Sequence, residues 1–183
     1  MNLRILLVTQ YFWPENFRIN DLVQGLVKLG HHVTVLTGKP NYPSGKIFDG
    51  YSLLGRRRET FAGAEVIRVP LVPRGNGGPV RLVFNFFSFA LLASLLGPVY
   101  CRGSFDVVFV YEPSPITVGL PGLVMKVVKR APMLLWVQDL WPESLSAIGA
   151  VKSQWVLDRV ASLVYFIYNG CDRVLVQSRA FVE

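Results

Sequence analysis

The sequence "FRINDLVQGLVKLGHHVTVLT", residues 17–37, joins the pattern of a helix to the pattern of a buried strand. Gly30 is a stop signal between the two, and the β-branched run Val33–Thr37 after it is typical of a strand. A similar run, Ile5–Thr9, precedes the helix. The helix is predicted over Phe17–Leu29 because one of its faces is apolar, through Ile19, Leu22, Val23, Leu26 and Val27. The stretch therefore predicts a strand–helix–strand unit with parallel strands.

The same alternation continues along the rest of the chain. Strands are predicted at Ile5–Thr9, Val33–Thr37, Glu65–Val69, Val107–Tyr111, Met133–Val137 and Arg173–Gln177. Further helices are predicted near Leu82–Leu96, Ile116–Lys129 and Gln154–Tyr168. Strands that alternate with helices predict an α/β fold with a parallel sheet. With 183 residues, 51% of them hydrophobic, the chain is expected to form a single domain.

Cysteine content and motifs narrow the class of protein. Cys101 and Cys171 are the only cysteines, too few for a disulfide framework or a cysteine-based metal site, and we expect both to be reduced in a cytoplasmic protein. The apolar run Ile5–Val8 is too short for a signal peptide. Neither GxGxxG nor GxxxxGK[ST] occurs, which argues against a nicotinamide dehydrogenase or a P-loop NTPase. We predict no cofactor and no metal.

The formal net charge of +7 predicts attraction to an acidic partner. The densest basic cluster, Arg56–Arg57–Arg58, lies in a predicted Gly-rich loop and lacks the interleaved aromatic residues that stack on bases. Two interpretations of this cluster are open: a solvated loop, or contact with phosphate or lipid headgroups. We expect no nucleic-acid partner.

Four loops are expected to meet at one edge of the sheet, because ligands of open parallel sheets bind beyond the carboxyl ends of the strands. These loops follow the first, second, fourth and fifth predicted strands. Their polar and aromatic residues include Tyr11, Trp13, Glu15, Asn16, Asn41, Tyr42, Glu112, Asp139, Trp141 and Glu143. Aromatic faces beside carboxylates suit sugar rings. They also suit ordinary packing of loop tips, and both interpretations are open.

The segment Leu82–Leu96 is almost entirely apolar and ends before Gly97–Pro98, which makes it too short to span a membrane. Arg81, Asn85 and Ser88 form a narrow polar stripe along it. Such a helix is either buried against the sheet or lies in a membrane interface.

Six motifs of the chain read, in order, "LLVTQYFWPE", "KPNYPSGKIFDGY", "GAEVIRVPLVPR", "DVVFVYEPSP", "QDLWPES" and "CDRVLVQSRAFVE". Together they resemble the N-terminal half of family-4 glycosyltransferases, in particular bacterial enzymes of O-antigen and colanic-acid assembly that transfer N-acetylfucosamine-type amino sugars. The resemblance covers almost the whole chain. The second and fifth of these motifs are the most specific.

The resemblance implies half of a GT-B fold: residues 1–183 as one Rossmann-like, acceptor-side domain, with the donor-binding domain outside this chain. The family's Glu-x7-Glu donor element is not present. The implied function is that of a retaining transferase that passes a sugar from a nucleotide-sugar, a UDP-sugar in our expectation, to a polyprenyl-diphosphate-linked glycan. No metal is implied for the chemistry. The fragment alone is expected to be inactive.

The resemblance also implies site residues. Asp139 is the expected catalytic residue, at the place where many family members carry a histidine; its alternative role is to cap the helix that follows. The expected acceptor-binding residues are Glu15, Asn16, Asn41, Tyr42, Glu112, Trp141 and Glu143. The family's first loop often carries a Gly-Gly pair near the donor diphosphate, which is missing from "WPENFRIND". Phe17 and Arg18, beside Asn16, are its substitutes by position.

A membrane-borne acceptor predicts a peripheral protein at the cytoplasmic face of the plasma membrane, held by an anionic lipid surface. Two alternatives remain open on the sequence: a non-catalytic α/β module that binds glycan or lipid phosphate, and a GT-B-like nucleotide-sugar epimerase. A Rossmann oxidoreductase is disfavoured by the missing glycine fingerprint.

Overall fold

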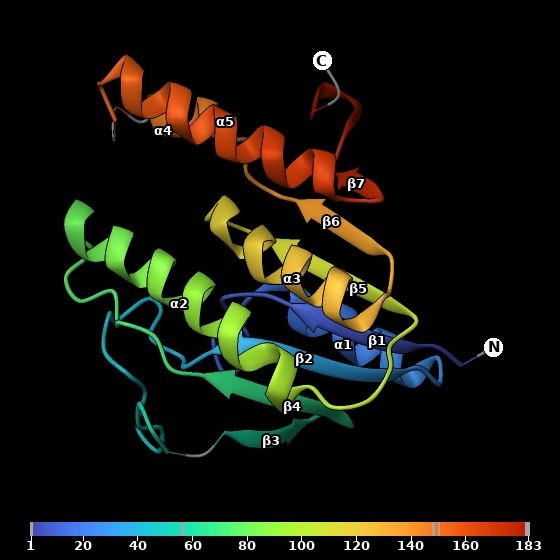
Figure 1. Cartoon of the computed structure of the whole chain (residues 1–183). Helices are drawn as coiled ribbons and strands as arrows, with labels where there is room; N and C mark the ends of the chain where they lie inside the picture. The colour runs from blue at the N-terminus through green and yellow to red at the C-terminus, as the bar shows by residue number, and fades with distance from the viewer. Residues whose placement is uncertain (1, 56, 148, 150, 182–183) are drawn as a thin grey trace.

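The computed structural model describes residues 2–55, 57–147, 149 and 151–181. Its seven-stranded sheet has the order β3-β4-β2-β1-β5-β6-β7, and every neighbouring pair except β3–β4 is parallel (Figure 1). The strands are β1 (Arg4–Val8), β2 (His32–Gly38), β3 (Arg58–Phe61), β4 (Ala64–Val69), β5 (Val107–Glu112), β6 (Met133–Val137) and β7 (Arg173–Val176). The predicted α/β fold is confirmed, and each of the six predicted strands is present within one residue at either end.

Helices cover both faces of the sheet. Helix α1 (Arg18–Lys28) lies behind it in Figure 1, and α2 (Pro79–Tyr100), α3 (Gly119–Lys129) and α5 (Gln154–Gly170) lie in front. Successive strands are added on one side of β1 up to β4 and on the other side from β5 onward. Because crossovers between parallel strands are right-handed, this change of direction moves the helices from one face to the other. Short helical turns complete the chain: η1 (Ile116–Val118), α4 (Glu143–Ala147) and η2 (Arg179–Phe181).

The alternation of side chains along each strand divides the core into two layers. On the α1 face, Leu7 of β1 and Val35 of β2 pack with Ile19 and Val23 of the helix. The α2–α3 face has a larger core that includes Leu6, Val8, Val110, Leu135, Phe89 and Met125, all fully or almost fully buried. The apolar stripe predicted for Phe17–Leu29 thus points into the core, as expected.

Strand β3 was not predicted. It pairs antiparallel with β4 at the edge of the sheet, with Phe61 opposite Ala64. Arg58 is its first residue, so the prediction that the whole arginine cluster lies in a loop is wrong there. The Arg58 guanidinium bonds to Glu65 and donates to the Tyr100 carbonyl at 2.6 Å. Arg56 lies outside the described residues.

The predicted end of the apolar helix at Gly97–Pro98 is also wrong. Helix α2 has 22 residues and continues through Pro98 to Tyr100. Its last turn is held by tertiary packing: Gly97 is buried against Leu36, so closely that an added Cβ would lie 2.8 Å from the Leu36 side chain. Packing of this kind compensates for the hydrogen bond that a proline removes from a helix.

The polar stripe of α2 faces inward from Asn85 onward, whereas Arg81 is exposed and donates to the Pro73 carbonyl at 3.0 Å. Asn85 is fully buried, and the Ser88 hydroxyl accepts a hydrogen bond from the Val72 amide at 2.8 Å. The opposite, outward face of the helix carries half-exposed or more exposed apolar side chains, which are Val80, Val83, Phe84, Phe87, Leu91, Leu95 and Val99. By length and composition α2 could cross a membrane, and only 28% of its most apolar stretch of 18 residues is buried in the structure. We call these seven residues the outer α2 face.

Candidate functional site

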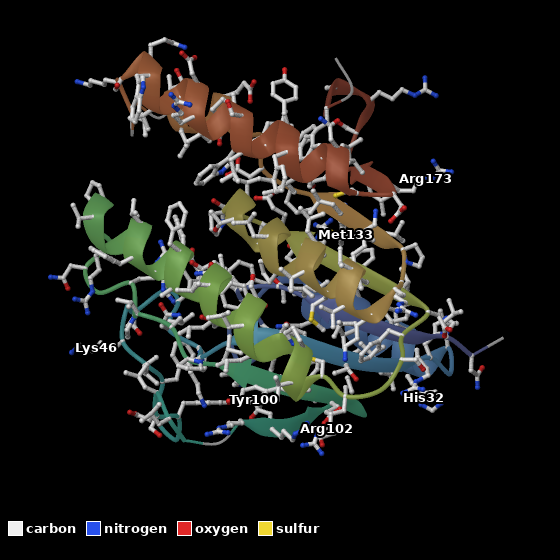
Figure 2. All side chains as sticks on the ribbon, in the orientation of Figure 1. His32, Lys46, Tyr100, Arg102, Met133 and Arg173 are labelled. Atoms are coloured by element: carbon white, nitrogen blue, oxygen red, sulfur yellow. The ribbon has the colours of Figure 1, made fainter. Side chains whose placement is uncertain are left out.

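The predicted site residues lie at the edge of the sheet where the parallel strands end, called here the loop edge. Figure 2 shows Lys46 of the β2–β3 loop at this end of the molecule, and His32 and Arg173 at the opposite end. The change of strand direction occurs between β1 and β5. In open α/β sheets this is the position where the loops diverge and leave room for a ligand.

Glu15 joins the first two loops. Its side chain is buried, with one oxygen accepting from the Asn41 and Tyr42 amides, both at 2.8 Å, and the other accepting from the Phe12 amide at 3.1 Å. Burial raises the pKa of the Glu15 carboxyl to about 7, although these three amides favour its charged form. Glu15 therefore holds the β2–β3 loop against the β1–α1 loop, so its predicted contact with an acceptor would be made through the loops that it positions.

Asn41 has a similar supporting position. It is fully buried, and its side-chain oxygen accepts from the Arg74 amide at 3.0 Å. Tyr42 is more exposed, and its ring lies 5.4 Å from the Phe17 ring and 4.9 Å beneath the Arg74 guanidinium. Tyr11 stacks on Phe17 with ring centroids 5.2 Å apart, and its ring also lies 5.7 Å from that of Tyr42. Of this group, Tyr42 presents the surface that a ligand could reach.

Asn16, Phe17 and Arg18, the predicted substitutes for a diphosphate contact, lie at the start of α1. Asn16 and Arg18 are exposed, and Phe17 is the N-cap residue, whose side chain makes no capping hydrogen bond. The backbone amides of this first turn point toward the loop edge, where the helix dipole favours negative charge. The three residues lie side by side because they are consecutive in the sequence, and their contact with a donor stays a prediction.

Glu112 is the last residue of β5 and has no exposed surface. Within the described residues, neither of its carboxyl oxygens makes a hydrogen bond of good geometry. Burial raises the pKa of Glu112 well above its usual value, and the negative charge of Asp139 raises it further, while the nearby amides of Asp139 and Gln138 oppose the shift. An unpaired buried carboxyl at the end of a central strand is costly, which is characteristic of functional sites.

Asp139 follows β6, the strand that pairs with β5. Its carboxylate accepts a hydrogen bond from the Trp141 indole nitrogen at 3.0 Å. The Trp141 ring in turn contacts Phe86 of α2 edge to face, with centroids 6.4 Å apart. Among the described residues, the first turn of α4 is bonded through the backbone, from the Ser144 amide to the Leu140 carbonyl at 2.8 Å, and not through Asp139. The geometry thus favours a role in the loop over the alternative of a helix cap.

Glu143 is exposed at the start of α4 and completes an acidic group with Glu112 and Asp139, called here the acidic cluster. Tyr168 of α5 faces it: burial raises the pKa of the Tyr168 hydroxyl to about 12, and the charges of Glu112, Glu143 and Asp139 contribute to the shift. In the part of the chain that the structure describes, no group of three or more His, Cys, Asp or Glu side chains could hold a metal ion.

Sequence reasoning missed a buried ion pair at the other side of the loop edge. Arg68 is 1% exposed and donates from Nε to Glu59 at 2.5 Å, and another of its nitrogens donates to the Gly38 carbonyl at 2.9 Å. The sequence does contain an indication of this ion pair, because "EVIRV" places the charged Arg68 within an apolar strand. A charge in such a position is paired when the strand is buried.

Comparisons with known proteins identify the family of the chain. A family model described as the glycosyl transferase 4-like domain matches residues 16–183. The chain belongs to this family. It is a glycosyltransferase-type domain. No curated protein sequence is significantly similar to the chain.

A solved structure supports the fold of this glycosyl transferase 4-like domain. The crystal structure of the calicheamicin glycosyltransferase CalG4 superposes on it with a TM-score of 0.50 at 15% identity. The match covers 94% of this chain and 42% of that chain, so the domain spans about two-fifths of the CalG4 chain. The prediction of half a GT-B fold is confirmed.

Proposed function

We propose that this domain is the acceptor-binding half of a retaining glycosyltransferase of bacterial surface polysaccharide synthesis. The enzyme would transfer a hexosyl or N-acetylamino sugar from a UDP-sugar to a polyprenyl-diphosphate-linked glycan. It would work at the cytoplasmic face of the plasma membrane. Membership of the glycosyl transferase 4-like family supports the reaction class, and residues 1–183 alone are expected to be inactive.

The outer α2 face is the observation that carries the proposal of a membrane-borne acceptor. Phe84, Phe87 and Leu91 are 60%, 53% and 60% exposed, although their helix is among the most apolar segments of the chain. Burying a large apolar side chain is worth roughly 1.5–3 kcal/mol. A helix with an apolar outward face is stabilised when that face enters the boundary between lipid headgroups and acyl chains.

The outer α2 face is also connected to the acidic cluster. Helix α2 begins at the loop edge, and Phe86 on the same helix contacts the Trp141 ring, whose indole nitrogen is bonded to Asp139. An acceptor that is anchored in lipid beside α2 would therefore arrive next to the loop that holds Asp139. The net charge of +7 adds attraction to an anionic surface, at about 1 kcal/mol for each basic residue near it.

In the proposed reaction, this half of the enzyme orients the acceptor hydroxyl toward the anomeric carbon of the donor. Asp139 would accept a hydrogen bond from a sugar hydroxyl and so hold the acceptor in place. The departing nucleotide diphosphate would take the proton of the attacking hydroxyl, as the front-face mechanism of retaining enzymes requires. Correct positioning would supply most of the rate enhancement.

Flotation with liposomes tests the membrane contact. We expect the protein to float with vesicles that contain phosphatidylglycerol, and to do so less at high salt because the charges are screened. The double variant Phe84→Ser/Phe87→Ser should lose most of this binding. Leu29→Ser is the matched control, since Leu29 is 73% exposed but ends α1 on the other face of the sheet. Equal partition with and without liposomes at low salt would overturn the proposal.

A further inference from the structure

We propose that a hollow of about 640 Å³ between the β1–α1 and β2–β3 loops is a saccharide-binding subsite, separate from the acidic cluster. Its lining includes Trp13, Lys46, Phe48, Asp49 and Tyr51. Figure 2 shows Lys46, which belongs to the β2–β3 loop, at the loop edge of the molecule. The volume falls within the roughly 300–1,000 Å³ that small-molecule sites occupy. The identity of the bound sugar as part of a transferase acceptor rests on the proposed function. The binding of a sugar in the hollow does not depend on it.

The buried Arg68–Glu59 ion pair holds both aromatic walls of the hollow. Arg68 donates to the Trp13 carbonyl, and its guanidinium lies 5.0 Å from the centre of the Tyr51 ring. The Tyr51 hydroxyl donates to Glu59 at 3.0 Å. One ion pair thus fixes the position of the Trp13 backbone and of the Tyr51 ring at once. Walls that are fixed before the ligand arrives lose little entropy on binding.

The Trp13 ring is supported from behind and open in front. Its centroid lies 5.4 Å from the Phe61 ring of β3, yet 38% of the residue remains exposed. An indole that is packed on one side and exposed on the other offers a flat apolar surface at low entropic cost, because the ring has few rotatable bonds. The unpredicted strand β3 therefore builds part of this site.

The chemistry of the lining fits a sugar ring better than a phosphate. Trp13, Phe48 and Tyr51 supply apolar and aromatic surface for the C–H groups of the ring. Lys46 and Asp49 are exposed at the rim and carry opposite charges, so together they do not select an anion. Their ammonium and carboxylate groups could instead donate to and accept from hydroxyl groups. A few polar groups around an apolar surface are the usual composition of a small-molecule site.

The hollow is too far from the acidic cluster to be the same site. Its lining comes from the loops after β1 and β2, whereas Glu112 and Asp139 end β5 and follow β6. Trp13 in this lining is held by Arg68 of β4, and β4 and β5 are three positions apart in the sheet, roughly 14 Å at about 4.8 Å for each position. This separation matches a sugar residue of a longer glycan, away from the residue that reacts.

Tryptophan side-chain NMR tests the proposal, because the chain has four tryptophans and each gives one indole N–H signal. The Trp13 signal is assigned by its loss in Trp13→Phe. The probes are the methyl glycosides of glucose, galactose, N-acetylglucosamine and N-acetylgalactosamine, each titrated to about 50 mM, which detects even the weak binding of single sugars. We expect at least one glycoside to shift the Trp13 signal, while the signal of Trp155, which is 66% exposed on α5, stays in place.

Rim variants keep the test independent of folding. Lys46→Ala and Asp49→Ala change exposed side chains, and each should weaken the saturable shift at least about threefold, as expected for the loss of one hydrogen-bonding partner. Lys152→Ala, also exposed but near α5, is the matched control and should leave the shift unchanged. No shift of Trp13 with any glycoside would overturn the subsite. A shift of Trp141 in place of Trp13 would also overturn it, and would leave the proposed transferase function standing.

Discussion

Asp139 is the candidate catalytic residue because of the position of its carboxylate and its hydrogen bond with Trp141. It follows a central strand at the loop edge, and the Trp141 indole orients its side chain by a hydrogen bond of 3.0 Å. The neighbouring Glu112 is buried without such a partner among the described residues. Two carboxyl groups at adjacent strand ends thus have different environments: that of Asp139 is hydrogen-bonded and that of Glu112 is fully buried.

Substitution of Asp139 separates its catalytic role from a structural one. In the enzyme that carries this domain, Asp139→Asn should lower the turnover of sugar transfer by about two orders of magnitude, because a charge-assisted hydrogen bond that strengthens in the transition state is lost. The melting temperature should hardly change, since the amide oxygen can still accept from Trp141. Asp158→Asn, on the exposed surface of α5, is the control and should keep full turnover. Wild-type turnover in Asp139→Asn would refute the catalytic role.

The raised pKa of Glu112 predicts how stability depends on pH. In the unfolded chain a glutamate ionises near pH 4.3, whereas burial keeps Glu112 neutral to higher pH in the folded state. The folded state therefore loses stability as the pH rises from about 4.3 toward the folded pKa, and one unit of difference corresponds to about 1.4 kcal/mol. Glu112→Gln, which cannot ionise, should raise the melting temperature relative to wild type more at pH 8 than at pH 5. An equal effect at both pH values would show that Glu112 is charged in the folded protein.

Helix α2 buries Asn85 together with apolar residues such as Phe89 and Ala93, and it exposes other apolar residues on its outer face. Asn85 joins the helix to two loops: its side chain accepts from Gln10 at 2.7 Å and donates to the Val72 carbonyl at 2.6 Å. These bonds account for the inward direction of the polar stripe, because the start of α2 covers loop backbone and not only strands. The outer α2 face is the consequence of this orientation.

Replacement of Asn85 should show how much this polar contact stabilises the element. Asn85→Leu has a similar volume but leaves Gln10 and the Val72 carbonyl without their partner, which should cost about 1–3 kcal/mol of unfolding free energy. Ser94→Ala is the control on the same helix. Its hydroxyl bonds only within α2, to the Ala90 carbonyl, so its loss should change stability by less than about 0.5 kcal/mol. Urea denaturation of both variants measures the difference, and equal stabilities would contradict it.

In the whole domain, three features converge at one end of the molecule: the acidic cluster, the proposed sugar hollow and the start of the outer α2 face. Parallel strands place all their following loops at the same edge, and α2 begins at that edge because it follows β4 (Figure 1). A membrane-borne glycan, as proposed above, would meet the outer α2 face, the proposed sugar hollow and the acidic cluster from one side. The opposite edge, where His32 lies, takes no part in this arrangement.

Local sequence was sufficient to place six of the seven described strands and the loops that follow them. The apolar stripe of residues 17–29 and the β-branched runs have periods of 3.6 and 2, which depend on neighbouring residues alone. Once the strands were known to be parallel, the position of Asp139 and Glu112 at one edge followed from geometry. Strand β3 was missed because "RETF" is short and polar, and it becomes a strand only by pairing with β4.

Tertiary structure alone decided which polar side chains are buried and which residues they contact. The polar stripe of α2 turned inward because loop carbonyls and amides far along the chain need partners, and Pro98 stayed helical because Gly97 packs on Leu36. Arg68 could be recognised as unusual in its strand, but its contacts with Glu59, Trp13 and Tyr51 form only in the folded chain. The physical reason is that the free energy of a buried polar group depends on the atoms around it, which contacts distant in sequence supply.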